Sequence, residues 1–320
     1  MSDEERRNCA DIAPAATDTS TDFSARDSSR ATQLHLCAIV PVYDHDQVVG
    51  AVVAQLRAAE MTVFLVDDGS HAACRDATEA LARGDAGITL LRHDVNQGKG
   101  AAVLTGMRAA LAAGFSHALQ VDADGQHDLC ALPALRALSA THPEALVSGM
   151  PTYDASVPAI RFYGRYATHV LVWINTLSLA IRDSMCGFRI YPIRPCVELS
   201  ERMRVGRRMD FDTDVMVRLF WAGTPVRFTP VRVSYPHDGV SHFDVVGDNL
   251  RLSRMHTRHF LLMLTRVITL RVRERGGSHR NSRGSAGATA LRSPCQRSDG
   301  QRSDGQRSSG QRSDGQRSGG

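Results

Sequence analysis

The residues best suited to chemistry lie in the stretch HALQVDADGQHD, residues 117–128, where an apolar run ends against four ionisable side chains. In an extended chain, residues two apart point to the same side, so Asp122 and Asp124 would present their carboxylates together. Two close carboxylates repel each other unless a cation or a proton lies between them. Mg²⁺ typically binds one or two protein carboxylates, and substrate phosphates complete its shell. The stretch therefore predicts a metal–phosphate site, with a polar turn at residues 124–125 as the alternative.

A second pair of carboxylates occurs in VDDGS, residues 66–70, which also follows an apolar run. Asp67 or Asp68 can accept hydrogen bonds from the base or the ribose of a nucleotide. The alternative is a simple turn in which Ser70 caps the next helix.

The motif NQGKG contains Lys99, the single lysine of the chain, and precedes a helical pattern. Its two glycines allow a ligand to approach the main chain, the helix N-terminus favours anions, and the lysine adds a point charge. The phosphate loop G-x-x-x-x-G-K-[ST] is absent. The motif predicts a phosphate contact outside that class.

Strand and helix signals alternate around these motifs. Such alternation predicts an α/β fold, a doubly wound and mostly parallel sheet with helices on both faces. The ligand of such a sheet binds at the carboxyl ends of the strands, where the polar motifs fall. The predicted strands are 36–43, 62–68, 88–94, 117–124 and 145–150, and the predicted helices are 46–60, 71–83, 99–113 and 129–141.

The two ends of the chain differ from its middle. Residues 1–33 lack periodicity, and 276–320 are a basic tail with QRSDG-type repeats, so both segments are predicted to be disordered. The domain is expected at 34–275 and ends in an amphipathic helix. The charges of residues 34–270 balance, which argues against nucleic acid as a partner. Cysteines within apolar runs, no secretory signal and no spanning segment predict a cytoplasmic protein.

In this order, the motifs IVPVY, VDDGS, NQGKG and DADGQH resemble those of family 2 glycosyltransferases of GT-A fold. The polyprenol-phosphate (dolichol-phosphate mannose) synthase branch is the most similar. The resemblance covers roughly residues 36–265 and includes CGFRIY, FDTDVMVRLFWAG and YPHDGVSHF. Relatives often read PVYNE where this chain has PVYDH, so His45 replaces a carboxylate.

The resemblance implies a role for each matching residue. The metal, Mg²⁺ or Mn²⁺, and the sugar-nucleotide diphosphate are assigned to Asp122, Asp124 and Gln126. The nucleoside is assigned to Pro41, Tyr43, Asp67 and Asp68, with Lys99 on the phosphates. The acceptor or its phosphate is assigned to Arg189, Ser241 and His242. The candidate catalytic carboxylates are Asp124, Asp212 and Asp214; for the last two the alternative is stabilisation of a helix N-terminus.

These assignments predict an inverting enzyme that moves a hexose from a nucleotide diphosphate sugar to a membrane-associated acceptor. Polyprenyl phosphate is favoured, because Asp214 is shorter than the Glu usual in relatives and a phosphate needs no protein base. The alternatives are a hydroxyl acceptor on a lipid or metabolite, a sugar-nucleotide pyrophosphorylase, and a non-catalytic membrane-surface binding protein. The apolar segments 158–181 and 256–275 are expected either in the core or at the membrane, where the protein would be peripheral on the inner face.

Overall fold

The computed structural model describes residues 34–152, 159–232 and 245–284. The predicted disordered segment 1–33 lies outside these residues, as do Ser241, His242 and the part of the predicted tail from 285 onward. The chain divides into two compact units, Met1–Val267 and Ile268–Gly320. All elements before helix α9 belong to the first unit, and the described part of the second is the end of α9.

A seven-stranded sheet has the order β3-β2-β1-β4-β6-β5-β7. Only β6 runs antiparallel to its neighbours β4 and β5, so the sheet is mostly parallel and the predicted fold class is confirmed. The strands are β1 Leu36–Val42, β2 Val63–Asp67, β3 Ile88–Arg92, β4 His117–Gln120, β5 Leu146–Thr152, β6 Arg189–Pro192 and β7 Val226–Arg232.

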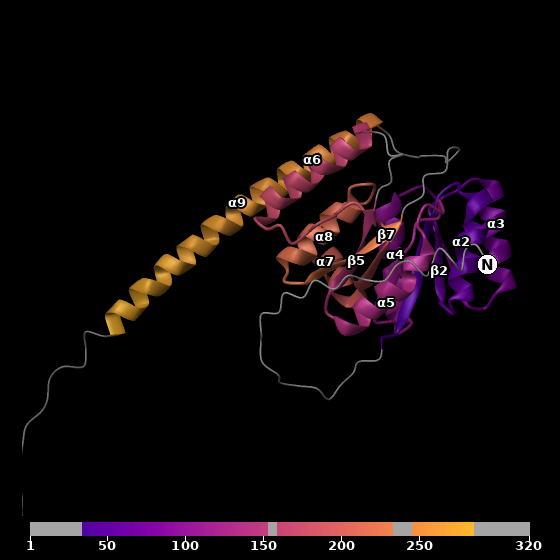
Figure 1. Cartoon of the computed structure of the whole chain (residues 1–320), viewed down its shortest axis with the longest axis horizontal. Helices are drawn as coiled ribbons and strands as arrows, with labels where there is room; N and C mark the ends of the chain where they lie inside the picture. Colours follow the sequence, from indigo (N-terminus) through magenta and orange to yellow (C-terminus); the bar gives the residue numbers. More distant parts are fainter. Residues whose placement is uncertain (1–33, 153–158, 233–244, 285–320) are drawn as a thin grey trace, which may run out of the picture. The chain divides into compact units, whose positions relative to one another are not determined.

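Helices cover both faces of this sheet (Figure 1). Neighbouring residues of a strand point to opposite faces. On β1, Ile39 contributes to a core shared with α4, α7 and α8, and Val40 to a core shared with α2 and α5. The helices are α2 Asp46–Ala58, α3 Ala72–Gly84, α4 Lys99–Ala112, the short 3₁₀ helix η1 Leu129–Ala131, α5 Leu132–Thr141, α6 Ala159–Thr176, α7 Ile193–Arg202, α8 Phe211–Trp221 and α9 Val245–Gly284.

The C-terminal helix is longer than predicted, since α9 continues past the expected boundary at residue 275 to Gly284. Adding a residue to an existing helix costs much less than starting one, which allows the helix to extend into a polar segment. Among the described helices, none is long and apolar enough to cross a membrane.

The predicted strand 117–124 is too long, because β4 ends at Gln120. Asp124 lies in a turn with Gly125, whose φ of 70° falls in the left-handed region. The main-chain N–H of Gln126 donates to Oδ1 of Asp124 at 3.0 Å, as in an Asx turn. The residues at 124–125 thus form a turn, and Asp122 and Asp124 are not two strand residues on one side; the turn does not decide whether the two residues bind a metal.

Two helical glycines allow a matched test of the packing. A Cβ at Gly106 in α4 would lie 2.6 Å from Cγ2 of Ile39, whereas a Cβ at Gly50 in α2 meets nothing within 4 Å. Gly106→Ala is expected to lower the free energy of unfolding by about 1–3 kcal/mol through overpacking. Gly50→Ala is expected to raise it by about 0.5–1 kcal/mol through helix propensity. Urea unfolding measures both; equal effects of the two substitutions would contradict the close packing of α4 on β1.

Candidate functional site

The NQGKG loop is held by the carboxylate of Asp68, which is buried at the end of β2. Asp68 accepts hydrogen bonds from the main-chain N–H groups of Gln97 at 2.9 Å and Gly98 at 2.7 Å. It also lies 2.6 Å from Nδ1 of His93. Gly98 has a φ of 100°, and a Cβ there would lie 2.5 Å from the main-chain oxygen of Arg207. The loop that begins α4 is therefore positioned by the protein itself.

Asp67 is also bound by protein groups. Its carboxylate accepts from the main-chain N–H of Ser70 and from Nε of Arg92, each at 2.9 Å. Ser70 does not cap α3, because its hydroxyl accepts from the main-chain N–H of Asp44 instead. The nucleoside contacts assigned to Asp67, Asp68, Pro41 and Tyr43 stay predictions, and Pro41 lies buried in β1.

The centre of the site is the ammonium of Lys99, which lies between two carboxylates. Nζ donates to Oδ2 of Asp122 at 2.8 Å and to Oδ2 of Asp212 at 2.9 Å. The three side chains come from the first turn of α4, the loop after β4 and the first turn of α8. Burial lowers the pKa of Lys99, but the two carboxylates outweigh burial and the pKa is raised. Lys99 is therefore a cation at physiological pH.

Asp212 is also held from the side of the core. Nε2 of Gln120 donates to its Oδ1 at 3.0 Å. Nη1 of Arg189 donates to its main-chain oxygen at 2.6 Å, and Nη2 of Arg189 to that of Ser184 at 2.6 Å. Arg189 has no exposed surface. The structure thus differs from the predicted contact of Arg189 with an acceptor phosphate, because the guanidinium is bound to main-chain oxygens in the core.

The loop before β6 approaches this cluster closely. A Cβ at Gly187 would lie 2.7 Å from Oδ2 of Asp122 and 2.8 Å from Nζ of Lys99, so a larger residue would displace the pair. The ring of His127 stacks on Phe188 with centroids 5.4 Å apart. Its Nδ1 is buried without a hydrogen-bond partner, and burial lowers the pKa of this histidine.

The oxygens near Lys99 have the chemistry that a magnesium or manganese ion requires. Oδ1 of Asp122 is buried and accepts no hydrogen bond, although it lies 2.8 Å from Nζ of Lys99. In the part of the chain that the structure describes, no group of three or more His, Cys, Asp or Glu side chains is arranged to hold a metal. Mg²⁺ is usually bound by one or two carboxylates and completed by phosphates. The buried Oδ1 of Asp122 is therefore suited to an ion that binds together with a diphosphate, and the assignment of Asp124 and Gln126 to the same ion stays a prediction.

Asp214 lies apart from the Lys99 cluster, two residues after Asp212. Its carboxylate is 2% exposed and accepts from Nε of Arg218, from Nε2 of His259 at 2.6 Å, and from the main-chain N–H of Gly206 at 2.7 Å. Burial raises the pKa of Asp214, but these partners outweigh it and the pKa is lowered. Asp214 thus joins α8 to α9, whereas Asp212 faces the candidate site.

The CGFRIY segment is tied to α6 through Asp183. Oδ2 of Asp183 accepts from Nε of Arg165 at 2.8 Å, and Oδ1 accepts from the main-chain N–H groups of Met185 and Cys186. On α6, Val172 is fully buried while Tyr166, Leu171 and Ile174 are 53%, 42% and 45% exposed. The described part of α6 therefore has one face in the core and one apolar face in solvent.

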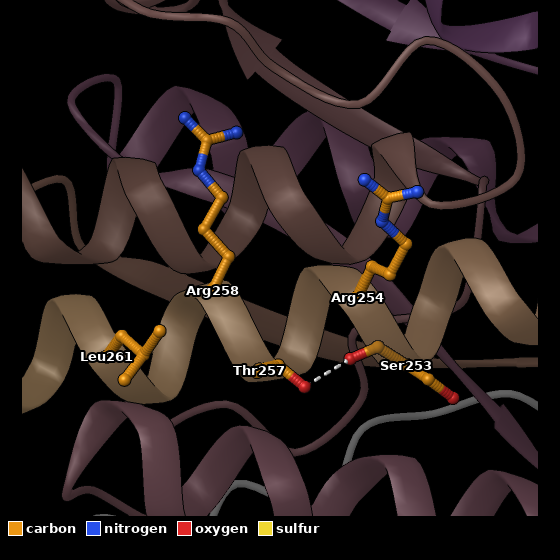
Figure 2. A pocket seen from close by; sticks show the side chains of 5 residues that line it. All are labelled: Ser253, Arg254, Thr257, Arg258 and Leu261. Atoms are coloured by element: carbon orange, nitrogen blue, oxygen red, sulfur yellow. Dashed lines mark hydrogen bonds between the residues drawn. The ribbon is translucent and has the colours of Figure 1, made fainter.

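An open hollow of about 360 Å³ lies on α9 (Figure 2). Figure 2 shows that the side chains of Arg254 and Arg258 extend from the same side of the helix. None of the predicted site residues lines the hollow, so it is a separate feature. Its lining residues are Ser253, Arg254, Thr257, Arg258 and Leu261.

Several residues of these networks were not among the predicted site residues. Gln120 and His127 lie within the quoted stretch 117–128, His93 begins the polar segment after β3, and Gly187 lies within CGFRIY, so the motifs gave a signal for all four. His259 had none, because it is one of many polar residues on α9 and pairs with Asp214 across 45 positions.

Comparison with known proteins agrees with the predicted resemblance. Residues 37–186 match the family described as glycosyl transferase family 2. An undecaprenyl-phosphate mannosyltransferase of Micrococcus luteus is 27% identical over 168 residues, 49% of this chain and 66% of that protein. A dolichyl-phosphate beta-glucosyltransferase of Trichomonas vaginalis is 24% identical over 225 residues, 68% of this chain and 63% of that protein. The chain thus spans slightly less than two thirds of either relative.

Among solved structures, glucosyl-3-phosphoglycerate synthase from Mycobacterium tuberculosis has a similar fold. The TM-score is 0.51 at 14% identity, and the match covers 75% of this chain and 85% of that one. At this identity the likeness concerns the fold alone, and it agrees with the predicted GT-A architecture.

Asp214→Asn is expected to destabilise the protein by about 3 kcal/mol at pH 7, because Arg218 would be left without its buried carboxylate. The folded-state pKa of Asp214 is lowered, so its contribution is present above the unfolded value of about 4 and is lost as the pH falls below it. Urea unfolding should show a smaller difference between the variant and the unsubstituted protein at about pH 3 than at pH 7.

Asp85→Asn is the matched control, since the pair of Asp85 with Arg57 lies at the surface and should matter little. Equal effects of the two substitutions at pH 7 would show that Asp214 does not anchor α9.

Proposed function

We propose that this protein moves a hexose from a nucleotide diphosphate sugar to polyprenyl phosphate. Residues 37–186 form a family 2 glycosyltransferase domain, which makes the protein a glycosyltransferase. The names of the two curated relatives, both lipid-phosphate sugar transferases, support this acceptor. The mostly parallel sheet agrees with the predicted GT-A fold, and the polar motifs lie at the carboxyl ends of β2 and β4, where such sheets bind their ligands.

The observation that carries the choice of acceptor is the state of the candidate bases. A hydroxyl acceptor needs a positioned group to take its proton, a contribution of roughly 10²- to 10⁴-fold. Asp212 is paired with Lys99 and bound by Gln120, and Asp214 is closed off by three donors. Neither of these two carboxylates is free to act as that base, and the third candidate, Asp124, is assigned here to the divalent ion. A phosphate monoester is already ionised and requires none.

The reaction is a single displacement. An oxygen of the acceptor phosphate forms a bond to the anomeric carbon as the bond from that carbon to the diphosphate oxygen breaks. Attack opposite the leaving group inverts the anomeric configuration, and the nucleoside diphosphate leaves with the bonding electron pair. The positive end of α4 and the charge of Lys99 favour the diphosphate at the N-terminus of this helix.

A divalent ion bound by Asp122, Asp124 and Gln126 would supply Lewis-acid stabilisation of the leaving diphosphate. The remaining chemistry of the site belongs to the chain. Asp68 holds the NQGKG loop against the strand ends, and Arg189 holds the first turn of α8 through the main chain of Asp212. Ser241 and His242, assigned to the acceptor phosphate, lie outside the described residues.

The lipid acceptor requires the enzyme to reach a membrane surface, and we assign this contact to α9 together with the exposed face of α6. On α9, exposed apolar side chains alternate with arginines, a composition that suits the interface of an anionic membrane. The exposed apolar residues of this helix are Val246, Leu250, Phe260, Leu261, Leu264 and Ile268. The inner face of the cytoplasmic membrane is the proposed location, since sugar nucleotides are cytoplasmic substrates.

The acceptor is tested with labelled sugar nucleotides and two lipids that differ in one group. Label should enter the organic phase with polyprenyl phosphate and not with the same polyprenol lacking phosphate. Transfer to both lipids, or to the alcohol alone, would favour the hydroxyl acceptor. Screening GDP-, UDP- and other sugar donors in the same assay identifies the base and the sugar.

The membrane contact is tested by flotation with vesicles of neutral and of anionic phospholipid. Replacing Arg254 and Arg258 with Gln should weaken binding to anionic vesicles by about 30-fold, from roughly 1 kcal/mol for each arginine. Replacing Arg75 and Arg83 of α3 with Gln removes the same charge elsewhere and should change binding little. Equal loss in the two double variants would mean that overall charge, rather than α9, directs the protein to the membrane.

A further inference from the structure

The single lysine of the chain occupies a position next to the oxygens that fit a metal. We infer that Lys99 is the resident counter-ion of Asp122 and Asp212, and that it makes binding of a divalent ion at Asp122 conditional on the diphosphate. The inference deepens the proposed function and rests on it for the nature of the ligand. It makes Lys99 a positioning residue whose partners include a predicted metal ligand.

The ammonium of Lys99 is in direct contact with both carboxylates. Nζ of Lys99 lies 2.8 Å from both carboxylate oxygens of Asp122 and 2.9 Å from Oδ2 of Asp212. The side chains of Lys99 and Asp212 are 17% and 8% exposed, so water screens this contact only in part. An ion coordinated by Asp122 would lie within a few ångströms of the ammonium. The side chain of Asp122 is 23% exposed, so two cations at that separation repel each other more strongly than they would in bulk water.

The net charge of the residues around Lys99 changes with each ligand that binds. The charges of Asp122, Asp124, Asp212 and Lys99 all act on the buried ring of His127, and the guanidinium of the buried Arg189 is 3.9 Å from Asp212. The cluster thus has one excess negative charge without ligands. A divalent ion alone would turn this into one excess positive charge. A diphosphate that carries two negative charges would restore the original balance.

The residues packed around Lys99 limit where its ammonium can move. Gly187 bounds the space beside Lys99 on the side of the loop before β6, since a Cβ at this position would come within 2.8 Å of Nζ. Asp212 is held by Gln120 and by Arg189. The ammonium therefore stays beside Asp122 unless another anion attracts it, and the diphosphate at the start of α4 is such an anion.

The direct test uses the unsubstituted full-length protein, because it contains one lysine and gives one side-chain ammonium signal. The protein is prepared with ¹⁵N in the lysine side chain and titrated with Mg²⁺, with GDP or UDP, and with each diphosphate plus Mg²⁺. The signal should keep its position with Mg²⁺ alone and shift when diphosphate and Mg²⁺ are both present. A shift with Mg²⁺ alone, or no shift under any condition, would overturn the inference.

The second test measures the affinity for Mn²⁺ from the resonance signal of the free ion. Lys99→Met should bind Mn²⁺ without nucleotide about tenfold more tightly than the unsubstituted protein and lose much of the enhancement by diphosphate. Arg57→Met, which removes a cation from a distant surface pair, should change neither value. If Lys99→Met does not fold, the double variant Lys99→Met/Asp212→Asn replaces it, because this variant removes the ammonium together with the charge of its second carboxylate partner. Unchanged or weaker Mn²⁺ binding in the folded variant contradicts the inference.

Asp124→Asn separates the ion site from its counter-ion. It should weaken Mn²⁺ binding in the presence of diphosphate without giving the tighter nucleotide-free binding expected of Lys99→Met. No acceptor lipid enters any of these measurements. Failure of sugar transfer to polyprenyl phosphate would therefore remove the proposed acceptor and leave the role of Lys99 intact, and the reverse also holds.

Discussion

The ion pairs of Lys99 with Asp122 and Asp212 are the interaction on which the candidate site depends. They join the first turn of α4, the loop after β4 and the first turn of α8, three elements that are far apart in the sequence. Carboxylates placed this close together would repel one another if the ammonium were absent. The site can therefore gather its acidic residues before any ligand is bound, and the pairing adds to the core packing that holds α8.

Around this centre, hydrogen bonds between charged side chains and main-chain groups hold the loops in place. The carboxylate of Asp68 binds the N–H groups of the NQGKG loop, and the guanidinium of Arg189 binds main-chain oxygens of α8 and of the loop before β6. Charged side chains bound in this way are costly to bury unless their hydrogen bonds are made. In this structure, these hydrogen bonds position the loops of the candidate site. They also account for the small exposed surface of Asp68 and Arg189.

The two acidic residues of α8 show how one helix serves two purposes. Residues two apart on a helix point in different directions. Asp212 accordingly faces the site, and Asp214 faces α9. The second contact links the catalytic half of the domain to the helix that we assign to the membrane. If the proposed lipid acceptor is correct, such a link would hold the helix at the membrane and the candidate site in a fixed relation, so that an acceptor held at the membrane could reach the donor sugar.

The sequence alone determined the fold class, the order of the main strands and helices, and the places where polar motifs end buried strands, because hydrophobic periodicity and turn residues are local signals. It also identified Asp122, Lys99 and Asp212 as residues of interest. Only the tertiary structure decided that these three form one charge cluster, that Arg189 lies in the core, and that Asp214 pairs with His259 on α9. Such pairings join residues from 23 to 113 positions apart, and which partner a charged side chain finds depends on packing that no local pattern encodes.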